Sequence, residues 1–113
     1  MTDELRVRSH DIIVPRTSRY AVLGAPISEA TEVWLVCHGY GQLAERFISR
    51  FSVIDDGKRM IVAPEGLSRF YLSSSSGGYS ASDKVGASWM TREGRDAEIV
   101  DQVRYLELVC ERV

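Results

Sequence analysis

The residues with the clearest chemical potential lie where an apolar run meets a glycine-rich turn. The run Trp34-Leu-Val-Cys37 is followed directly by His38-Gly-Tyr-Gly41. Two glycines let the backbone bend sharply and turn an amide outward, at the carboxyl end of a strand where open α/β sheets bind ligands. The main-chain N–H of Tyr40 could there stabilise negative charge on a carbonyl oxygen during acyl transfer. The same spacing also fits a tight strand-to-helix turn with no chemical role.

Metal and phosphate chemistry are poorly supported by the remaining residue types. Cys37 and Cys110 lie far apart without a Cys-x-x-Cys pair, and we interpret both as small core residues. Only His10 and His38 could add imidazole ligands, so the spacing predicts no metal site, and no cofactor is implied. A phosphate loop is disfavoured because no Lys or Ser/Thr follows the glycine turn in that pattern.

An antiparallel hairpin is expected at the start of the chain. Residues Leu5–Val14 alternate apolar and polar side chains, which is typical of a strand with one solvated face, and Pro15 ends the run. A second short strand is predicted over Arg19–Leu23, closed by the turn residues Gly24-Ala-Pro26. Together they predict a hairpin at an edge of the sheet.

The middle of the chain predicts a strand, a helix and a second strand. Val33–Cys37 is apolar on both faces, as in a buried parallel strand. Gln42–Ser52 has the helical period, and Asp55-Asp56-Gly57 breaks it. Arg59–Ala63 is a further buried strand, stopped by Pro64. This order predicts a parallel crossover.

The last part of the chain predicts one long helix after a stretch without periodicity. Residues 64–92 show no sustained period. From Gly94 onward an apolar stripe predicts a helix, with Thr91 as a possible N-cap and acidic Asp96 and Glu98 near its start. The stripe consists of Ile99, Val103, Leu106, Cys110 and Val113, widened by Val100 and Val109.

Composition places the chain among ordinary globular domains. Its 113 residues are 44% apolar and 27% charged, with a formal net charge of −2, so we expect a single α/β domain over residues 1–113. This balance and the lack of a Lys/Arg cluster disfavour nucleic acid as a partner. The apolar run Glu32–Cys37 is too short to cross a membrane, and the charged start lacks a signal peptide, so we expect a cytoplasmic protein.

Three segments in the same order resemble a known family of enzymes. They are Val36-Cys-His-Gly-Tyr-Gly-Gln42, Met60-Ile-Val-Ala-Pro-Glu-Gly-Leu-Ser-Arg-Phe-Tyr71, and Gly86-Ala-Ser-Trp-Met-Thr-Arg92 with the helix after it. They resemble the amino-terminal half of the α/β-hydrolase serine esterases of the phospholipase/carboxylesterase group, which are related to acyl-protein thioesterases. The resemblance covers nearly the whole chain. It implies an edge hairpin followed by parallel strands with flanking helices.

The resemblance also assigns roles to individual residues. It implies that the Tyr40 N–H is one arm of an oxyanion hole. The surrounding turn consists of His38, Gly39 and Gly41, and His38 shapes this turn rather than acting as a catalytic base. It places three aromatic residues near an acyl or leaving-group pocket, although core packing is an equal alternative for each: Phe70, Tyr71 and Trp89. The loop Ser73–Ser82 could form a rim over that pocket or be solvated without a role.

The catalytic groups of the resembled family are absent from this sequence. Its nucleophile lies on a Gly-x-Ser-x-Gly elbow after the next strand, followed by the acid and the histidine. No such elbow occurs here and no histidine follows His38. We therefore expect an amino-terminal half that is truncated and inactive on its own. Two other arrangements are conceivable from residue types. One combines His38 with Asp55 or Asp56 and a loop serine. The other is an acid/base pair of Glu65 with Asp83 or Asp96, although surface carboxylates of this kind are usually just solvated.

A non-catalytic reading of the same residues remains open. In the strand order of the resembled family, Val33–Cys37 lies beside the strand that is missing here, which would leave an apolar edge unpaired. Such a chain could be a remnant or a binding module that associates through this edge. The expected partners are a second copy or a separate chain carrying the complementary carboxyl-terminal half, with an ester or thioester as substrate if the site is completed.

Overall fold

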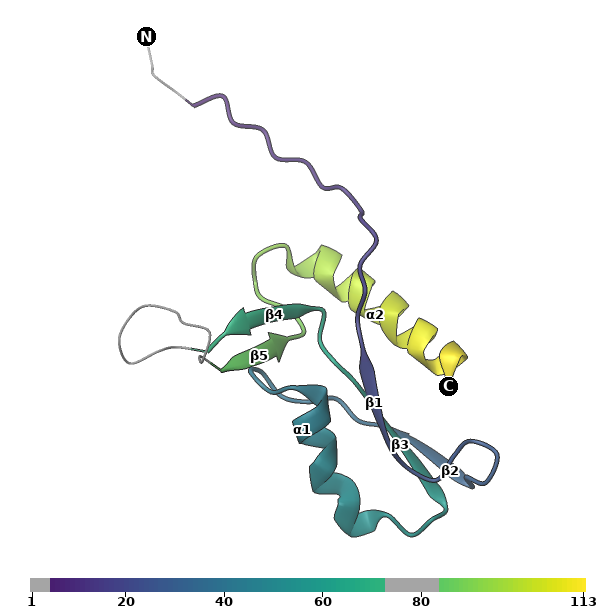
Figure 1. The fold of residues 1–113 in the computed structure, drawn as a ribbon. Helices are drawn as coiled ribbons and strands as arrows, with labels where there is room; N and C mark the ends of the chain where they lie inside the picture. The colour runs from purple at the N-terminus through teal and green to yellow at the C-terminus, as the bar shows by residue number, and fades with distance from the viewer. Residues whose placement is uncertain (1–4, 73–83) are drawn as a thin grey trace.

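Both strands and helices occur along the chain in the computed structural model, which describes residues 5–72 and 84–113 (Figure 1). The described residues thus form a mixed α/β fold. The elements, in order, are β1 (Tyr20–Gly24), β2 (Glu32–Leu35), α1 (Ala44–Ser49), the 3-10 helix η1 (Arg50–Ile54), β3 (Arg59–Pro64), β4 (Ser68–Tyr71), β5 (Val85–Ser88) and α2 (Arg95–Arg112).

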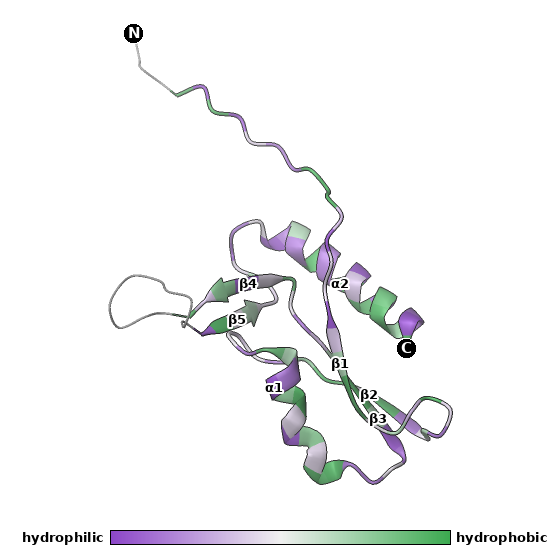
Figure 2. Ribbon diagram, viewed as in Figure 1, coloured by the Kyte–Doolittle hydropathy of each residue, from purple (hydrophilic) through white to green (hydrophobic). Residues whose placement is uncertain are grey.

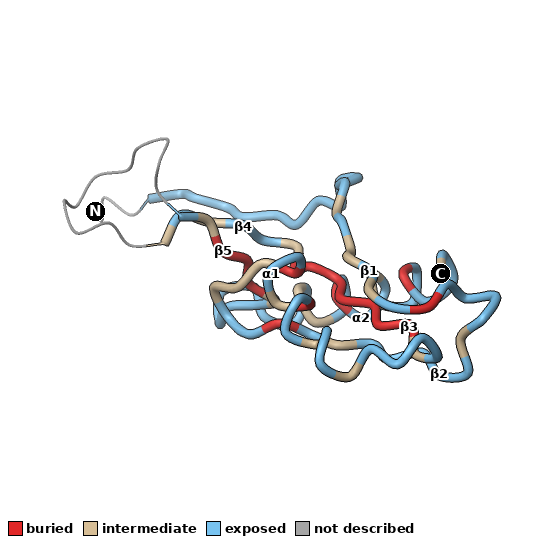
Figure 3. Tube along the Cα trace, turned by 60° about the horizontal axis from the view of Figure 1, so that its bottom comes forward, coloured by how far each residue is buried: buried red, intermediate tan, exposed pale blue. Residues whose placement is uncertain are grey.

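The larger sheet is built around β3. Its strand order is β1-β3-β2, with β1 antiparallel to β3 and β2 parallel to it. Residues Met60–Pro64 of β3 are all buried, and Figure 3 shows the buried segment running through this strand. The predicted strand, helix and parallel strand are therefore confirmed, because an apolar run without alternation needs cover on both faces.

Helices cover the two faces of this sheet. On one face, Ala44 and Ile48 of α1 pack against Ile61 and Ala63. On the other face, Val109 of α2 packs against Met60 and Val62. Alternate residues of β3 thus point into two different clusters, as strand geometry requires. Figure 2 shows the hydrophobic segments concentrated along the strands and the inner parts of both helices.

The predicted strand over Leu5–Val14 and its edge hairpin are wrong. Residues 5–19 form no strand and leave the fold as an extended arm, with Ile12 and Ile13 each 83% exposed (Figure 1). We call residues 5–19 the arm. The strand predicted over Arg19–Leu23 exists as β1, but it pairs with β3. Residues 15–19 continue outward without reversing the chain, so the alternating segment does not fold back onto β1 (Figure 1).

Strand β2 is less buried than its apolar sequence predicts. It pairs with β3 on one side only, and all four of its residues are exposed, including Val33 at 49% and Leu35 at 42%. An apolar sequence shows that a strand is able to be buried, but its actual burial depends on whether another element packs against it. Among the described strands, β2 is thus an open edge, as the non-catalytic reading expects.

Residues 64–92 contain a hairpin that the sequence did not reveal. Strands β4 and β5 pair antiparallel, with Phe70 opposite Gly86. Each strand has only four residues, which is too short for a clear alternating pattern. The loop Ser73–Ser82, predicted as a possible rim, lies outside the described residues.

Helix α2 is confirmed, but its cap and its buried face differ from expectation. Its N-cap is Gly94, with φ of 63°, whereas Thr91 instead bonds to Glu98. The face toward the sheet carries Tyr105, Val109 and Val113. Of the predicted stripe, Val109 and Val113 lie on this face, whereas Val100, Val103 and Cys110 are exposed on its flank.

Both cysteines are exposed, so the interpretation of Cys37 and Cys110 as core residues is wrong. Each lies on a surface that has no covering layer: Cys37 follows the edge strand β2, and Cys110 lies on the flank of α2. No helix in the described part of the chain combines the length and the apolar character needed to cross a membrane.

Candidate functional site

The glycine turn after β2 is held in place by strand β5. The Gly41 N–H donates to the carbonyl of Ala87 at 2.9 Å, and the Ala87 N–H donates to the carbonyl of Gln42 at 3.0 Å. Gly41 has φ of 79°, a conformation that favours glycine. A Cβ on Gly86 would lie 2.4 Å from the carbonyl oxygen of Gly41. Glycine is thus required on both sides of this contact.

His38 forms the inner side of the same turn. It is buried, its Nδ1 donates to the carbonyl of Gly39 at 2.8 Å, and its Nε2 accepts the N–H of Gly66 at 2.9 Å. The Trp89 indole donates to the His38 carbonyl at 2.8 Å and stacks on the imidazole at 5.0 Å between ring centroids. Both ring nitrogens are used within the fold, which favours a positioning role over that of a base.

The backbone N–H of Tyr40 differs from those of Gly39 and Gly41 on either side of it, because it has no hydrogen-bond acceptor among the described residues. Within residues 5–72 and 84–113, no hydrogen bond joins the Tyr40 N–H to another residue, while the N–H groups of Gly39, Gly41 and Gln42 are all bonded. The Tyr40 side chain is 73% exposed, and its ring lies 5.1 Å from that of Phe70. An unpaired donor thus stands at the carboxyl end of β2, beside an aromatic pair.

The predicted aromatic residues fall into different places. Phe70 lies against Tyr40, and Trp89 lies against His38 beneath the turn. Tyr71 is next to Phe70 in β4, so its side chain points to the opposite face of that strand. The turn, Phe70 and Trp89 are therefore brought together, whereas Tyr71 is not.

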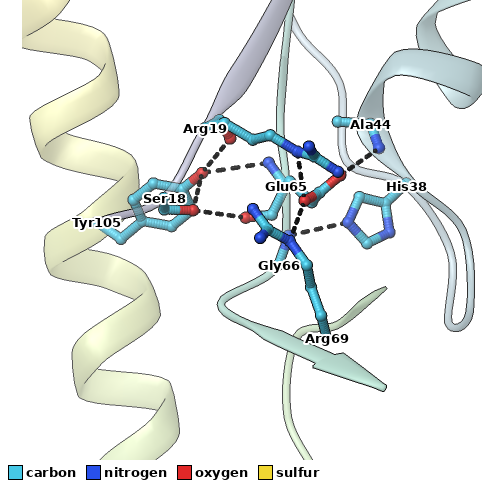
Figure 4. Close-up of polar contacts among 8 residues, drawn as sticks. All are labelled: Ser18, Arg19, His38, Ala44, Glu65, Gly66, Arg69 and Tyr105. Atoms are coloured by element: carbon cyan, nitrogen blue, oxygen red, sulfur yellow. Dashed lines mark hydrogen bonds and ion pairs between the residues drawn. The ribbon is translucent and has the colours of Figure 1, made fainter. Parts of the chain in front are cut away.

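Glu65 is the residue of this region that sequence reasoning missed. Its carboxylate, expected to be solvated, is fully buried (Figure 4). The guanidinium groups of Arg19 and Arg69 each donate to Oε2 at 2.8 Å, and the Ala44 N–H donates to Oε1 at 3.1 Å. One side chain thus ties together the start of β1, the end of β3, the start of α1 and β4. The Pro-Glu-Gly sequence directly after a buried strand was the available signal.

Tyr105 extends this set of contacts to α2. Its hydroxyl donates to the carbonyl of Arg19 at 2.9 Å and accepts the Glu65 N–H at 3.1 Å (Figure 4). Burial raises the pKa of the Tyr105 phenol. The helix is thereby fixed to the same end of the sheet as the turn.

Stability is expected to fall in acid because of Glu65. Burial alone would raise the pKa of Glu65, but hydrogen bonds from Arg19, Arg69 and the Ala44 N–H outweigh it and hold the pKa below the ordinary value of 4.5. Because the pKa of Glu65 is lower in the folded state than in the unfolded state, its ionisation stabilises the fold. This stabilisation is fully present above pH 4.5 and is lost as the pH falls through the pKa that Glu65 has in the folded state. Urea unfolding from pH 7 downward should show a free energy of unfolding that decreases below that point. Glu65→Gln should flatten this decrease; an unchanged slope would contradict the assignment.

The alternative catalytic sets are not assembled. Asp55 and Asp56 precede β3, whereas His38 follows β2, and since these strands are parallel the carboxylates and the imidazole lie at opposite ends of the sheet. Glu65 is committed to its arginines, and its proposed partner Asp83 lies outside the described residues. No group of three or more His, Cys, Asp or Glu side chains suited to a metal occurs in the described part of the chain.

Two surface hollows lie away from the turn. One of about 430 Å³ is lined by Val103, Leu106, Glu107, Cys110 and Glu111 of α2. The other, of about 240 Å³, is lined by Arg19, Tyr20, Ala21, Ala44 and Glu45. Neither is lined by a residue of the glycine turn.

Comparison of the chain with models of protein families, with curated proteins and with solved structures finds no match. The described residues form a mixed α/β protein in which the Tyr40 N–H of the glycine turn has no hydrogen-bond partner among them. What this amide binds is therefore argued from the site itself.

Proposed function

We propose that this chain provides part of the oxyanion hole of a serine hydrolase of the α/β-hydrolase class, acting on carboxylic esters or thioesters. The observation that carries the proposal is the unpaired Tyr40 N–H at the carboxyl end of β2. Amides in this position are able to stabilise the negative oxygen that develops when a nucleophile attacks a carbonyl. The resemblance of the three sequence segments points to carboxylesterases, phospholipases and thioesterases as the group.

In this proposal the chain supplies a hydrogen-bond donor to the reacting carbonyl but not the nucleophile. A serine oxygen supplied by another segment or chain would attack the carbonyl carbon, and the carbonyl oxygen would take up the electron pair beside the Tyr40 N–H. Loss of one such donor typically costs a factor of about 10²–10³ in kcat. His38 and Trp89 position the turn, while Tyr40 and Phe70 offer aromatic surface to an acyl or leaving group.

No residue of this sequence fits the nucleophile elbow, because Gly-x-Ser-x-Gly does not occur in it. We therefore expect negligible ester hydrolysis by the chain alone. No metal or cofactor has a part in this proposal.

Nuclear magnetic resonance provides the test of the oxyanion assignment. Titrating the ¹⁵N-labelled chain with methylphosphonate, an anionic mimic of the tetrahedral adduct, should shift the Tyr40 amide signal. The Gly41 amide is the internal control, since it is bonded to Ala87 and should shift much less. The Tyr40→Phe variant keeps the N–H and should respond like the original chain.

Two results would contradict the proposal. An unchanged Tyr40 amide at millimolar methylphosphonate would remove the oxyanion site. Turnover of p-nitrophenyl acetate together with labelling by a fluorophosphonate probe would show that the chain has its own nucleophile, and so would contradict the supporting part assigned to it.

A second candidate function is a non-catalytic module that associates through its sheet. The exposed apolar edge strand β2 favours it, because unpaired edges of this kind readily add a further strand. This function makes no use of the Tyr40 amide.

A further inference from the structure

An open corner lies between the edge strand β2 and helix α2. The register pairs Val33 with Met60 and Leu35 with Val62, so Val33 and Leu35 lie on the face of the sheet that α2 covers. Both side chains are nearly half exposed. Helix α2 covers β3 on this face through Val109 but leaves β2 uncovered. We call Val33 and Leu35, with the outer backbone of β2, the open edge.

The flank of α2 that faces the open edge is also without a partner. Tyr105 turns toward β1, where its hydroxyl bonds to Arg19. Leu106 lies about 100° further around the helix, so its flank turns away from β1 and toward the β2 side. The hollow of about 430 Å³ lies on this flank, where Val103, Leu106 and Cys110 give it an apolar lining, and Glu107 and Glu111 add negative charge on its solvent side.

The outer part of the arm, residues 5–17, is a second unpartnered surface in the same molecule. Its large apolar side chains are 63% to 86% exposed: Leu5, Val7, Ile12, Ile13 and Val14. Within the described residues, no hydrogen bond joins residues 5–17 to another residue. The arm carries Arg6 and Arg8, opposite in charge to the lining of the α2 hollow. It is therefore an extended segment with apolar and basic side chains and no pairing partner.

The two surfaces of one molecule are poorly placed to meet each other. The arm continues outward from the start of β1, and β1 and β2 are the opposite edges of the sheet (Figure 1). Reaching β2 in the same molecule would require the chain to reverse over residues 15–18 and then to pass both β1 and β3, because the strand order is β1-β3-β2. An extended arm of residues 5–19 spans up to about 50 Å, which is ample for reaching another molecule.

We propose that residues 5–14 of one copy pair as an additional strand with the open edge of a second copy. Each copy has one arm and one open edge, so two copies are able to exchange arms reciprocally, and the dimer is the smallest assembly in which every arm and every edge is paired. Direct pairing of two β2 edges would bring the two acidic α2 flanks together and leave both arms uncovered. This inference deepens the second candidate function and is independent of ester chemistry.

Sedimentation velocity of full-length variants tests the exchange under reducing conditions, since both cysteines are exposed. The original chain should sediment as a dimer. The arm variant Ile12→Lys/Val14→Lys should sediment as a monomer, because it replaces apolar side chains that would be buried against the open edge with charged ones. The edge variant Val33→Lys/Leu35→Lys should also sediment as a monomer, because it does the same at the edge and repels the basic arm. An equimolar mixture of the two variants should restore dimers, since it contains one intact arm and one intact edge.

The control is Val53→Lys, which adds one positive charge at a highly exposed site on η1, away from the arm and the open edge, and should leave the dimer intact. Far-UV circular dichroism checks that every variant is folded. A dimeric arm variant with a monomeric edge variant would overturn the arm inference while sparing association through the edge. Three results would overturn the exchange: a monomeric original chain, a mixture of the two variants without dimers, or an edge variant that remains dimeric. A monomeric original chain or a dimeric edge variant would also remove the second candidate function.

Discussion

The Glu65→Ala variant should lose about 3 kcal/mol of unfolding free energy. Removing one partner of a buried ion pair costs about 3–5 kcal/mol when the charge left behind stays buried. Here Arg19 and Arg69 are 52% and 37% exposed, so both can return to water and escape part of that cost. The Ala44 N–H loses its acceptor, however, and the removed carboxylate leaves a gap in a fully buried place. For a small domain this is a large share of the total stability.

Urea unfolding monitored by tryptophan fluorescence measures this loss. The matched control is Glu45→Ala, which removes an exposed carboxylate from α1 and should change the free energy by less than about 0.5 kcal/mol. A Glu65→Ala loss no larger than that of the control would show that the carboxylate does not tie these elements together.

The second large effect is expected for Gly86→Ala. The added Cβ would lie 2.4 Å from the carbonyl oxygen of Gly41, and neither backbone can yield without breaking the bridge between Gln42 and Ala87. Forcing an extra carbon into such a place costs about 1–3 kcal/mol. The turn should also shift, so the Tyr40 and Gly41 amide signals should move in the ¹⁵N spectrum.

The control for this prediction adds a Cβ within the same turn. In Gly39→Ala the new carbon would meet only the side-chain oxygen of Gln42 at 3.1 Å, and that side chain can rotate away. Its stability should change by much less than that of Gly86→Ala. Equal losses in the two variants would mean that the contact between Gly41 and Gly86 is not what limits this position.

The elements that the sequence predicted best are those with strong local patterns. The apolar run of β3 requires cover on both faces of the sheet, and the apolar face of α1 requires a surface to pack on. Both conditions are met in the structure. The glycine turn after β2 is present for the same reason, because a left-handed Gly41 is a local requirement. The predicted role of Tyr40 in binding an oxyanion stays a prediction.

The features that the sequence did not predict depend on distant partners. Glu65 is buried only because Arg19, far earlier in the chain, and Arg69 converge on it. The arm has the alternation of a strand, but pairing also needs an available edge and a turn to reach it. Which flank of α2 faces the sheet is likewise decided by Tyr105 and its bonds to β1, not by the apolar stripe alone.

The strand order β1-β3-β2 has a consequence for the ribosome. The strand that pairs with both β1 and β2 is the last of the three to be synthesised. At translation rates of about 5–20 residues per second, the first two strands wait for a second or more with their apolar residues unpaired. Neither β1 nor β2 can therefore find its partner strand until β3, through Pro64, has left the exit tunnel.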